Sequence, residues 1–331
     1  MRAILVPLFV LAAAPAVAEA PRLGLPIDCR LGESCWVMNY PDTDPGPGAR
    51  DHVCRPRTYD GHAGTDFAVR DLAAMRRGVA VLAAAPGTVV AVRDGVEDGA
   101  WIAGRKKEIV QARRQCGNRV AIDHGDGWVT DYCHMRKGSI RVRMGEQVRA
   151  GQPIGLVGTS GMTDFPHAHM GVLHFAPGSK DGDPMDPFTG HDLKAGCGRA
   201  GAPLWAVPLG YQAGAFYGAG FADHIPKGVE VKERASGVER LPPNAPALVV
   251  WGTLFGAAKG DRLRVRMTGP DGSLLLDKTV VVDGNQAWRL SAMGKNRPQG
   301  GWKPGRYAAT MSWQRAGRPT VSRAVMVEVR P

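Results

Sequence analysis

The sequence predicts a mainly β protein built from a compact antiparallel sheet followed by a small β-sandwich. From Gly61 onward, short runs of apolar and β-branched residues recur between glycines, a pattern typical of short strands. A stretch rich in Gly, Ala and Pro over residues 198–245 separates two such regions. The 331 residues suffice for two domains. We therefore expect a first domain over 61–197, a linker over 198–245 and a second domain over 246–331.

The N-terminus has the pattern of a secretory signal peptide over residues 1–18. Arg2 precedes an apolar run over residues 4–14, and Ala16 and Ala18 fit an A-x-A cleavage site. This run is shorter than the roughly 20 residues of a membrane span, and no later segment comes closer, so we expect no integral membrane anchor. The prediction is a periplasmic or secreted protein.

The net charge of the chain is +11, which falls to +10 when the segment containing Arg2 is removed. A basic exported protein favours polyanionic surroundings such as a cell wall or a membrane surface. A nucleic-acid partner is not expected, because the Lys and Arg residues are scattered rather than gathered in one run. The sequence identifies no protein partner.

Six cysteines in an exported chain predict disulfides. Residues 125–127, Gly-Asp-Gly, form the expected turn of a hairpin that brings Cys116 and Cys133 together. No C-x-x-C spacing is present, which disfavours a cysteine-bound metal. The other cysteines are assigned, without support from their spacing, to the pairs Cys35–Cys54 and Cys29–Cys197.

Two segments of the first half lack a sustained period. Residues 19–60 are rich in Pro, Gly and Asp, and we expect an irregular arm held by disulfides. Residues 94–114 carry mixed charge and are interpreted as a solvated loop or a short helix. The segments expected to form strands of the first sheet are 79–84, 87–92, 118–124, 128–134 and 147–157.

The C-terminal region alternates polar and apolar residues. In residues 262–267 three arginines alternate with Leu263, Val265 and Met267, which predicts one wet and one buried face. About six strands with this spacing are typical of a β-sandwich. Residues 303–307 resemble the turn and tyrosine before a late strand of immunoglobulin-like domains, so we expect an immunoglobulin-like accessory domain.

Histidines at three places point to one metal site. His167 and His169 flank a single residue in an extended segment, so both side chains are expected on one face of a strand. His62 and Asp66 supply a nitrogen and an oxygen of the types that zinc accepts. With His169 as the third ligand, the fourth tetrahedral position stays open for water, as catalytic zinc requires.

These segments resemble the ordered motifs of the lysostaphin-type (LytM-like) zinc metallopeptidases, which cut peptide bonds in bacterial peptidoglycan. The resemblance covers about residues 55–180 and implies a compact antiparallel sheet with the site in a groove. It rests on the segments 62–66, 117–124, 132–134, 145–161 and 166–169. Met135 and Gly171 depart from the residues that are common in the family.

The resemblance also implies roles for individual residues. One Zn²⁺ is expected on His62, Asp66 and His169, and the two catalytic residues are expected to be His134 and His167. Asn118 matches a position near the substrate groove, with a turn or cap role as the alternative. Asn39 is a candidate to cover the open metal position in a latent form.

The expected function is therefore that of an exported zinc endopeptidase that hydrolyses peptidoglycan cross-links through a zinc-activated water. The alternative is a non-catalytic relative that binds peptidoglycan or activates an amidase. Such relatives typically lose ligands or catalytic histidines, whereas all five residues are present here. A lipoyl-type carrier is disfavoured because residues 145–161 contain no acceptor lysine.

Overall fold

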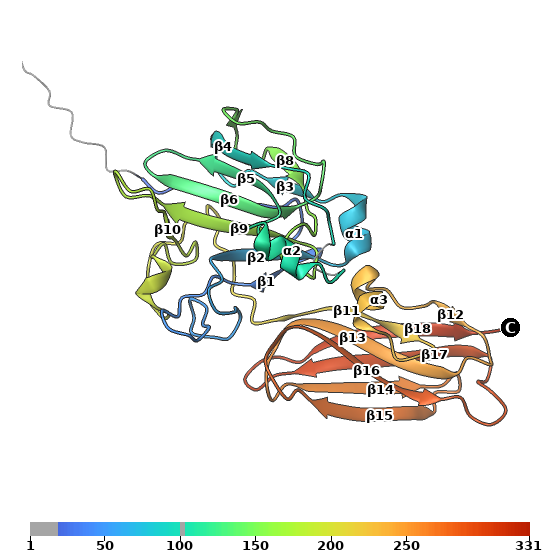
Figure 1. The fold of residues 1–331 in the computed structure, drawn as a ribbon. Helices are drawn as coiled ribbons and strands as arrows, with labels where there is room; N and C mark the ends of the chain where they lie inside the picture. The colour runs from blue at the N-terminus through green and yellow to red at the C-terminus, as the bar shows by residue number, and fades with distance from the viewer. Residues whose placement is uncertain (1–18, 100–102) are drawn as a thin grey trace, which may run out of the picture.

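The computed structural model describes residues 19–99 and 103–331, and the predicted signal peptide lies outside this part of the chain. The protein is mainly β, as predicted, and its sheets are antiparallel apart from one short parallel pair (Figure 1). Strands β1 to β10 form a first unit, and strands β11 to β18 form a C-terminal unit.

The main sheet of the first unit has the strand order β1-β2-β9-β6-β5-β4-β7, with β10 paired to β9. Its strands are β1 (Cys35–Asn39), β2 (Gly64–Val69), β4 (Gly87–Arg93), β5 (Asn118–Asp123), β6 (Trp128–Met135), β7 (Gln147–Val148), β9 (His167–His174) and β10 (Asp183–Pro184). A separate pair joins β3 (Ala80–Leu82) to β8 (Pro153–Leu156). The helices of this unit are α1 (Leu72–Arg77), α2 (Lys106–Gln111) and the 3-10 helix η1 (Leu193–Ala195).

Alternation along β9 shows how the sequence builds this sheet. Ala168, Met170 and Val172 are buried in the main apolar core of the unit. The histidines at 167 and 169 alternate with these residues and therefore face the other side. The predicted turn after β5 is present, where the Trp128 amide donates to the Gly125 carbonyl at 2.9 Å.

The C-terminal unit contains two sheets that share one buried apolar cluster. The three-stranded sheet consists of β11 (Ala215–Ala222), β13 (Ala247–Ala257) and β16 (Gln286–Asn296). The five-stranded sheet has the order β12 (Arg240–Leu241), β18 (Val321–Val329), β17 (Gly305–Gln314), β14 (Arg262–Thr268) and β15 (Leu274–Val281). Helix α3 (Gly228–Glu233) follows β11. The immunoglobulin-like classification stays a prediction.

Two predicted irregular segments contain strands. The arm contributes β1, which pairs with β2 as the edge strand of the main sheet. The linker contributes β11 and β12. The glycines of β11 reflect close packing rather than a loop, because a Cβ on Gly220 would lie 2.3 Å from the Cα of Gly237.

The structure contains the predicted Cys116–Cys133 disulfide. The pairings Cys35–Cys54 and Cys29–Cys197 are wrong, because the chain folds differently around the arm. A tight turn in which the Gly32 amide donates to the Cys35 carbonyl brings Cys29 to Cys35. The arm lies against the end of the first unit, which joins Cys54 to Cys197.

The helices of the structure bear on two further expectations from the sequence. Residues 106–111 of the mixed-charge insert form α2, whose residues are exposed apart from Ile109. Among the described residues, no helix combines the length and apolar character needed to cross a membrane.

Candidate metal centre

The three strands that carry the site are neighbours in the main sheet, in the order β2-β9-β6. Asp66 of β2 pairs directly with His169 of β9, and His169 pairs on its other side with Cys133 of β6. Asn39 of β1 pairs with Asp66 and extends this row. Residues that are a hundred positions apart in the sequence therefore meet on one face of the sheet.

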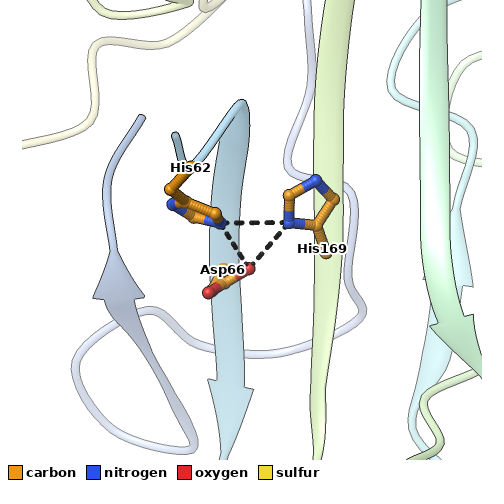
Figure 2. A group of neighbouring side chains, drawn as sticks. All are labelled: His62, Asp66 and His169. Atoms are coloured by element: carbon orange, nitrogen blue, oxygen red, sulfur yellow. Dashed lines mark hydrogen bonds and ion pairs between the residues drawn. The ribbon is translucent and has the colours of Figure 1, made fainter. Parts of the chain in front are cut away.

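His62, Asp66 and His169 converge (Figure 2). Nε2 of His62 lies 3.1 Å from Oδ1 of Asp66 and 3.1 Å from Nδ1 of His169. Nδ1 of His169 lies 2.9 Å from the same oxygen. In a tetrahedral zinc site with bonds of about 2.0–2.1 Å, ligand atoms lie about 3.3 Å apart. The observed separations fit such a site closely.

The hydrogen bond of His62 to the backbone also suits a metal site. Nδ1 of His62 donates to the Tyr40 carbonyl at 2.7 Å, so Nε2 carries a lone pair. That lone pair faces a carboxylate oxygen and a second imidazole nitrogen. Two imidazole nitrogens and one carboxylate oxygen at these distances are a donor set that fits Zn²⁺.

Asn39 fixes the carboxylate. Its Nδ2 donates to Oδ2 of Asp66 at 2.8 Å, which leaves Oδ1 for the metal. Asn39 is buried and lies on the edge strand β1. The structure thus gives Asn39 a supporting contact to a proposed ligand. Its place over the open metal position stays a prediction.

His134 and His167 lie beside the three metal-binding candidates. Their ring centroids are 4.7 Å apart, and the His134 ring is 5.9 Å from that of His169. Nδ1 of His134 donates to the Ser160 carbonyl, and Nδ1 of His167 donates to the Phe165 carbonyl, both at 2.8 Å. These bonds fix the tautomers, so Nε2 of each neutral ring carries the lone pair. Nε2 of His167 lies 3.3 Å from Oδ1 of Asp66, the oxygen that also faces His62 and His169.

His134 reaches the site through an unusual backbone conformation. Because Cys133 pairs with His169, a regular strand would turn His134 to the opposite face. His134 instead has a φ of +61°, in the left-handed region. Its amide donates to the Cys116 carbonyl at 2.8 Å, next to the Cys116–Cys133 disulfide. Such backbone conformations cluster at functional sites, which fits the role predicted for His134.

Burial and charge push the pKa values of this cluster apart. Burial alone would raise the pKa of Asp66, but the surrounding imidazoles hold it well below its usual value. Burial, together with the neighbouring His167, lowers the pKa of His134 well below its usual value. Burial would lower the pKa of His167, but Asp66 raises it.

The predicted substrate contact of Asn118 is wrong. Asn118 is fully buried, and its Nδ2 donates to the carbonyls of Val96 and Met135, each at 2.9 Å. Its Oδ1 accepts the Val96 amide at 2.7 Å. With every polar atom of the amide used, Asn118 ties the mixed-charge insert to the end of β6.

The sequence did not predict that Tyr59 lies beside the metal-binding candidates. It is 47% exposed, and its ring centroid lies 4.5 Å from that of His62 at the edge of the site. Burial of its hydroxyl, and then the charge on Asp66, raise its pKa. No spacing signal connects a tyrosine in an irregular arm to a metal site, so only the fold places it there.

Residues 60–187 match the model of peptidase family M23. The chain carries an M23 peptidase domain. This match contains all five histidine and aspartate residues of the site, and the predicted resemblance to lysostaphin-type peptidases is confirmed.

Curated relatives match short parts of this chain. The cell division protein DipM of Caulobacter vibrioides is 42% identical over 72 residues, which are 22% of this chain and 11% of DipM. The peptidoglycan DD-endopeptidase ShyA of Vibrio cholerae is 34% identical over 112 residues, which are 34% of this chain and 20% of ShyA. The chain therefore spans only a small part of these relatives.

Solved structures resemble about half of this chain. The catalytic domain of the M23 protein EnpA from Enterococcus faecalis is 25% identical, with 52% of this chain and 98% of that chain covered and a TM-score of 0.32. The catalytic domain of lysostaphin from Staphylococcus simulans is 22% identical, with 45% and 85% covered and a TM-score of 0.27. At these TM-scores the family assignment rests on the sequence match.

Proposed function

We propose that this chain is a zinc-dependent endopeptidase that acts in the periplasm or outside the cell and hydrolyses peptide cross-links of peptidoglycan. The observation that carries this proposal is the convergence of three acceptor atoms with two further histidines whose tautomers are fixed. A structural zinc site has four protein ligands, whereas three ligands with an open position are typical of catalytic zinc.

The five residues have two different roles in the proposed hydrolysis. His62, Asp66 and His169 would hold the zinc ion, which would supply Lewis-acid chemistry by polarising a carbonyl and lowering the pKa of water. Nε2 of His134 and Nε2 of His167 accept and return a proton or donate to the developing negative charge. The backbone bonds to their Nδ1 atoms hold both rings in one orientation, so little reorganisation is needed during the reaction.

The substrate class is supported by the relatives and by charge. ShyA and ShyB of Vibrio cholerae are peptidoglycan DD-endopeptidases, and each matches part of this chain. The basic balance of this chain favours the polyanionic surroundings of a cell envelope. Three disulfides fit an oxidising compartment.

The test combines metal analysis with digestion of purified peptidoglycan. We expect one zinc per chain, release of muropeptides identified by mass spectrometry, and loss of release on chelation. His169→Ala is expected to lose zinc and hydrolysis together. His134→Asn is expected to retain zinc and lose hydrolysis, and asparagine tolerates the left-handed backbone at this position.

Two results would contradict the proposal. Stoichiometric zinc in His169→Ala would remove this residue from the ligand set. A zinc-loaded wild-type protein that binds peptidoglycan without cutting it would favour the alternative, a non-catalytic binding or amidase-activating relative.

A further inference from the structure

We infer that the C-terminal unit positions the M23 site, because its aromatic face holds two of the segments that orient site residues. A distinct buried cluster lies between the two units. The first unit contributes Trp36, Met38 and Phe165, and the C-terminal unit contributes Tyr217, Trp251 and Phe255 among others. This inference rests on the proposed hydrolytic function and assigns the C-terminal unit a role within it.

The first connection runs through Phe165 to His167. The Phe165 side chain is 1% exposed, and its ring lies 5.3 Å from the ring of Phe255 in an edge-to-face contact. A second contact joins it to Tyr217 at 6.4 Å. The carbonyl of Phe165 accepts the Nδ1 proton of His167. The C-terminal unit therefore holds the residue whose main chain fixes the tautomer of a catalytic candidate.

The second connection runs through β1 to Asp66. Trp36 of β1 lies 5.3 Å from Tyr217 and 6.1 Å from Phe255, measured between ring centroids. Three residues further along the same strand, Asn39 donates to Oδ2 of Asp66. A shift of β1 thus moves the group that leaves Oδ1 free for the metal.

Arg57 fastens β1 from the same side. This buried guanidinium donates to the carbonyls of Val37 at 2.6 Å and Met38 at 2.8 Å. A Cβ on Gly256 would lie 2.3 Å from its Nη1, so the end of β13 packs directly on it. The glycine has a φ of +63° and leaves the space that Arg57 fills.

Polar contacts around α3 fix the orientation of the two units, and Figure 1 shows α3 next to α1. Oδ2 of the buried Asp71 accepts the Ala235 amide at 3.0 Å. Lys232 pairs with Asp164 at 2.7 Å, and Asp164 lies three residues before His167. These bonds restrict sliding of the interface, which apolar contacts alone would allow.

Strand β13 supplies a matched pair of variants. Leu254 and Phe255 are adjacent and both fully buried, but they face opposite sides. Leu254 belongs to the core that the two C-terminal sheets share, and Phe255 belongs to the cluster between the units. Phe255→Ala removes the contacts to Phe165 and Trp36 of the first unit, together with the stack of Phe255 on Tyr217 in its own unit. Leu254→Ala weakens the C-terminal unit alone.

The experiment uses the full chain with zinc, well below the unfolding temperature of either variant. We expect Phe255→Ala to lower kcat about 10- to 100-fold with KM nearly unchanged, because displaced groups impair the reaction more than binding. Leu254→Ala is expected to keep kcat within about twofold of wild type. The conservative Phe255→Leu is expected to restore part of kcat and keeps the test usable where Phe255→Ala fails to fold.

An independent readout separates this inference from the proposed function. In chains with ¹⁵N-labelled histidine, the Nδ1–H resonance of His167 is expected to shift or broaden in Phe255→Ala and to stay unchanged in Leu254→Ala. This measurement needs no activity, so an inactive wild-type protein would overturn the proposed function alone. Equal effects of both variants on kcat and on this resonance, or no effect of either, would overturn the positioning role.

Discussion

Gly64 provides a sharp test of the metal site, because it is the residue against which the His169 ring lies. A Cβ built on Gly64 would be 2.6 Å from Nε2 of His169 and 2.6 Å from the Met170 carbonyl oxygen. A normal contact needs about 3.4 Å, so Gly64→Ala forces a displacement of about 0.8 Å, whereas metal–ligand distances tolerate about 0.2 Å. The His169 ring must move, and strands β2 and β9 must separate at the Met170 carbonyl; both movements displace His169 from Asp66 and His62.

We expect Gly64→Ala to weaken zinc binding by about 10- to 100-fold or more, because losing a contact that supports a metal ligand typically lowers metal affinity by about this factor. Competition with a fluorescent chelator measures the affinity. Gly171 is the matched control, because it pairs directly with Gly64 across the sheet. A Cβ there meets no atom closer than 3.7 Å, so Gly171→Ala should bind zinc like wild type. Wild-type affinity in Gly64→Ala, or equal loss in both variants, would refute the geometry.

Three further predictions concern stability. Replacing Cys116 and Cys133 together by serine should lower the free energy of unfolding, measured with urea, by about 3 kcal/mol. The double variant should also retain zinc and turn over substrate with a lower kcat. An unchanged kcat would show that the disulfide does not hold His134 in place. Burial would raise the pKa of Asp261, but Arg315 lowers it, so the stabilisation is present above about pH 4 and is lost as pH falls through the folded pKa. Asp261→Asn should therefore lower the free energy of unfolding by about 2 kcal/mol at pH 7, which is below the range of about 3–5 kcal/mol for breaking a fully buried pair. Unfolding curves at acid pH should show the difference between variant and wild type disappearing. A difference that does not change with pH would contradict this prediction. Zinc at 100 times its Kd should raise the unfolding free energy by about 2.7 kcal/mol, measured against chelated protein, and no shift would argue against binding to the folded state.

The sequence predicts those parts of the structure that follow from local periodicity. The hairpin of β5 and β6 and the exposure pattern of β14 follow from alternation and a Gly-rich turn. The convergence of His62, Asp66 and His169 was predicted from residue types and the family resemblance.

Features that depend on contacts between distant segments were not predictable. Strand β1 has too little period to be distinguished from a loop, and it is ordered by pairing with β2. Asn118 looks like a surface residue in a motif, but the insert folds over it and uses its amide. The left-handed backbone at His134 arises from the Cys116 and Ser160 contacts, which no periodicity reports.

The Cys54–Cys197 bond joins positions 143 residues apart, and every proposed metal and catalytic residue lies inside the ring that it closes. Proteolysis at the exposed tip over residues 176–181 would therefore leave two fragments still tied by sulfur. Such a nicked molecule would run as one band on a gel without reductant and as two with it. In an environment that contains other proteases, this closure protects the assembled site against a single cut.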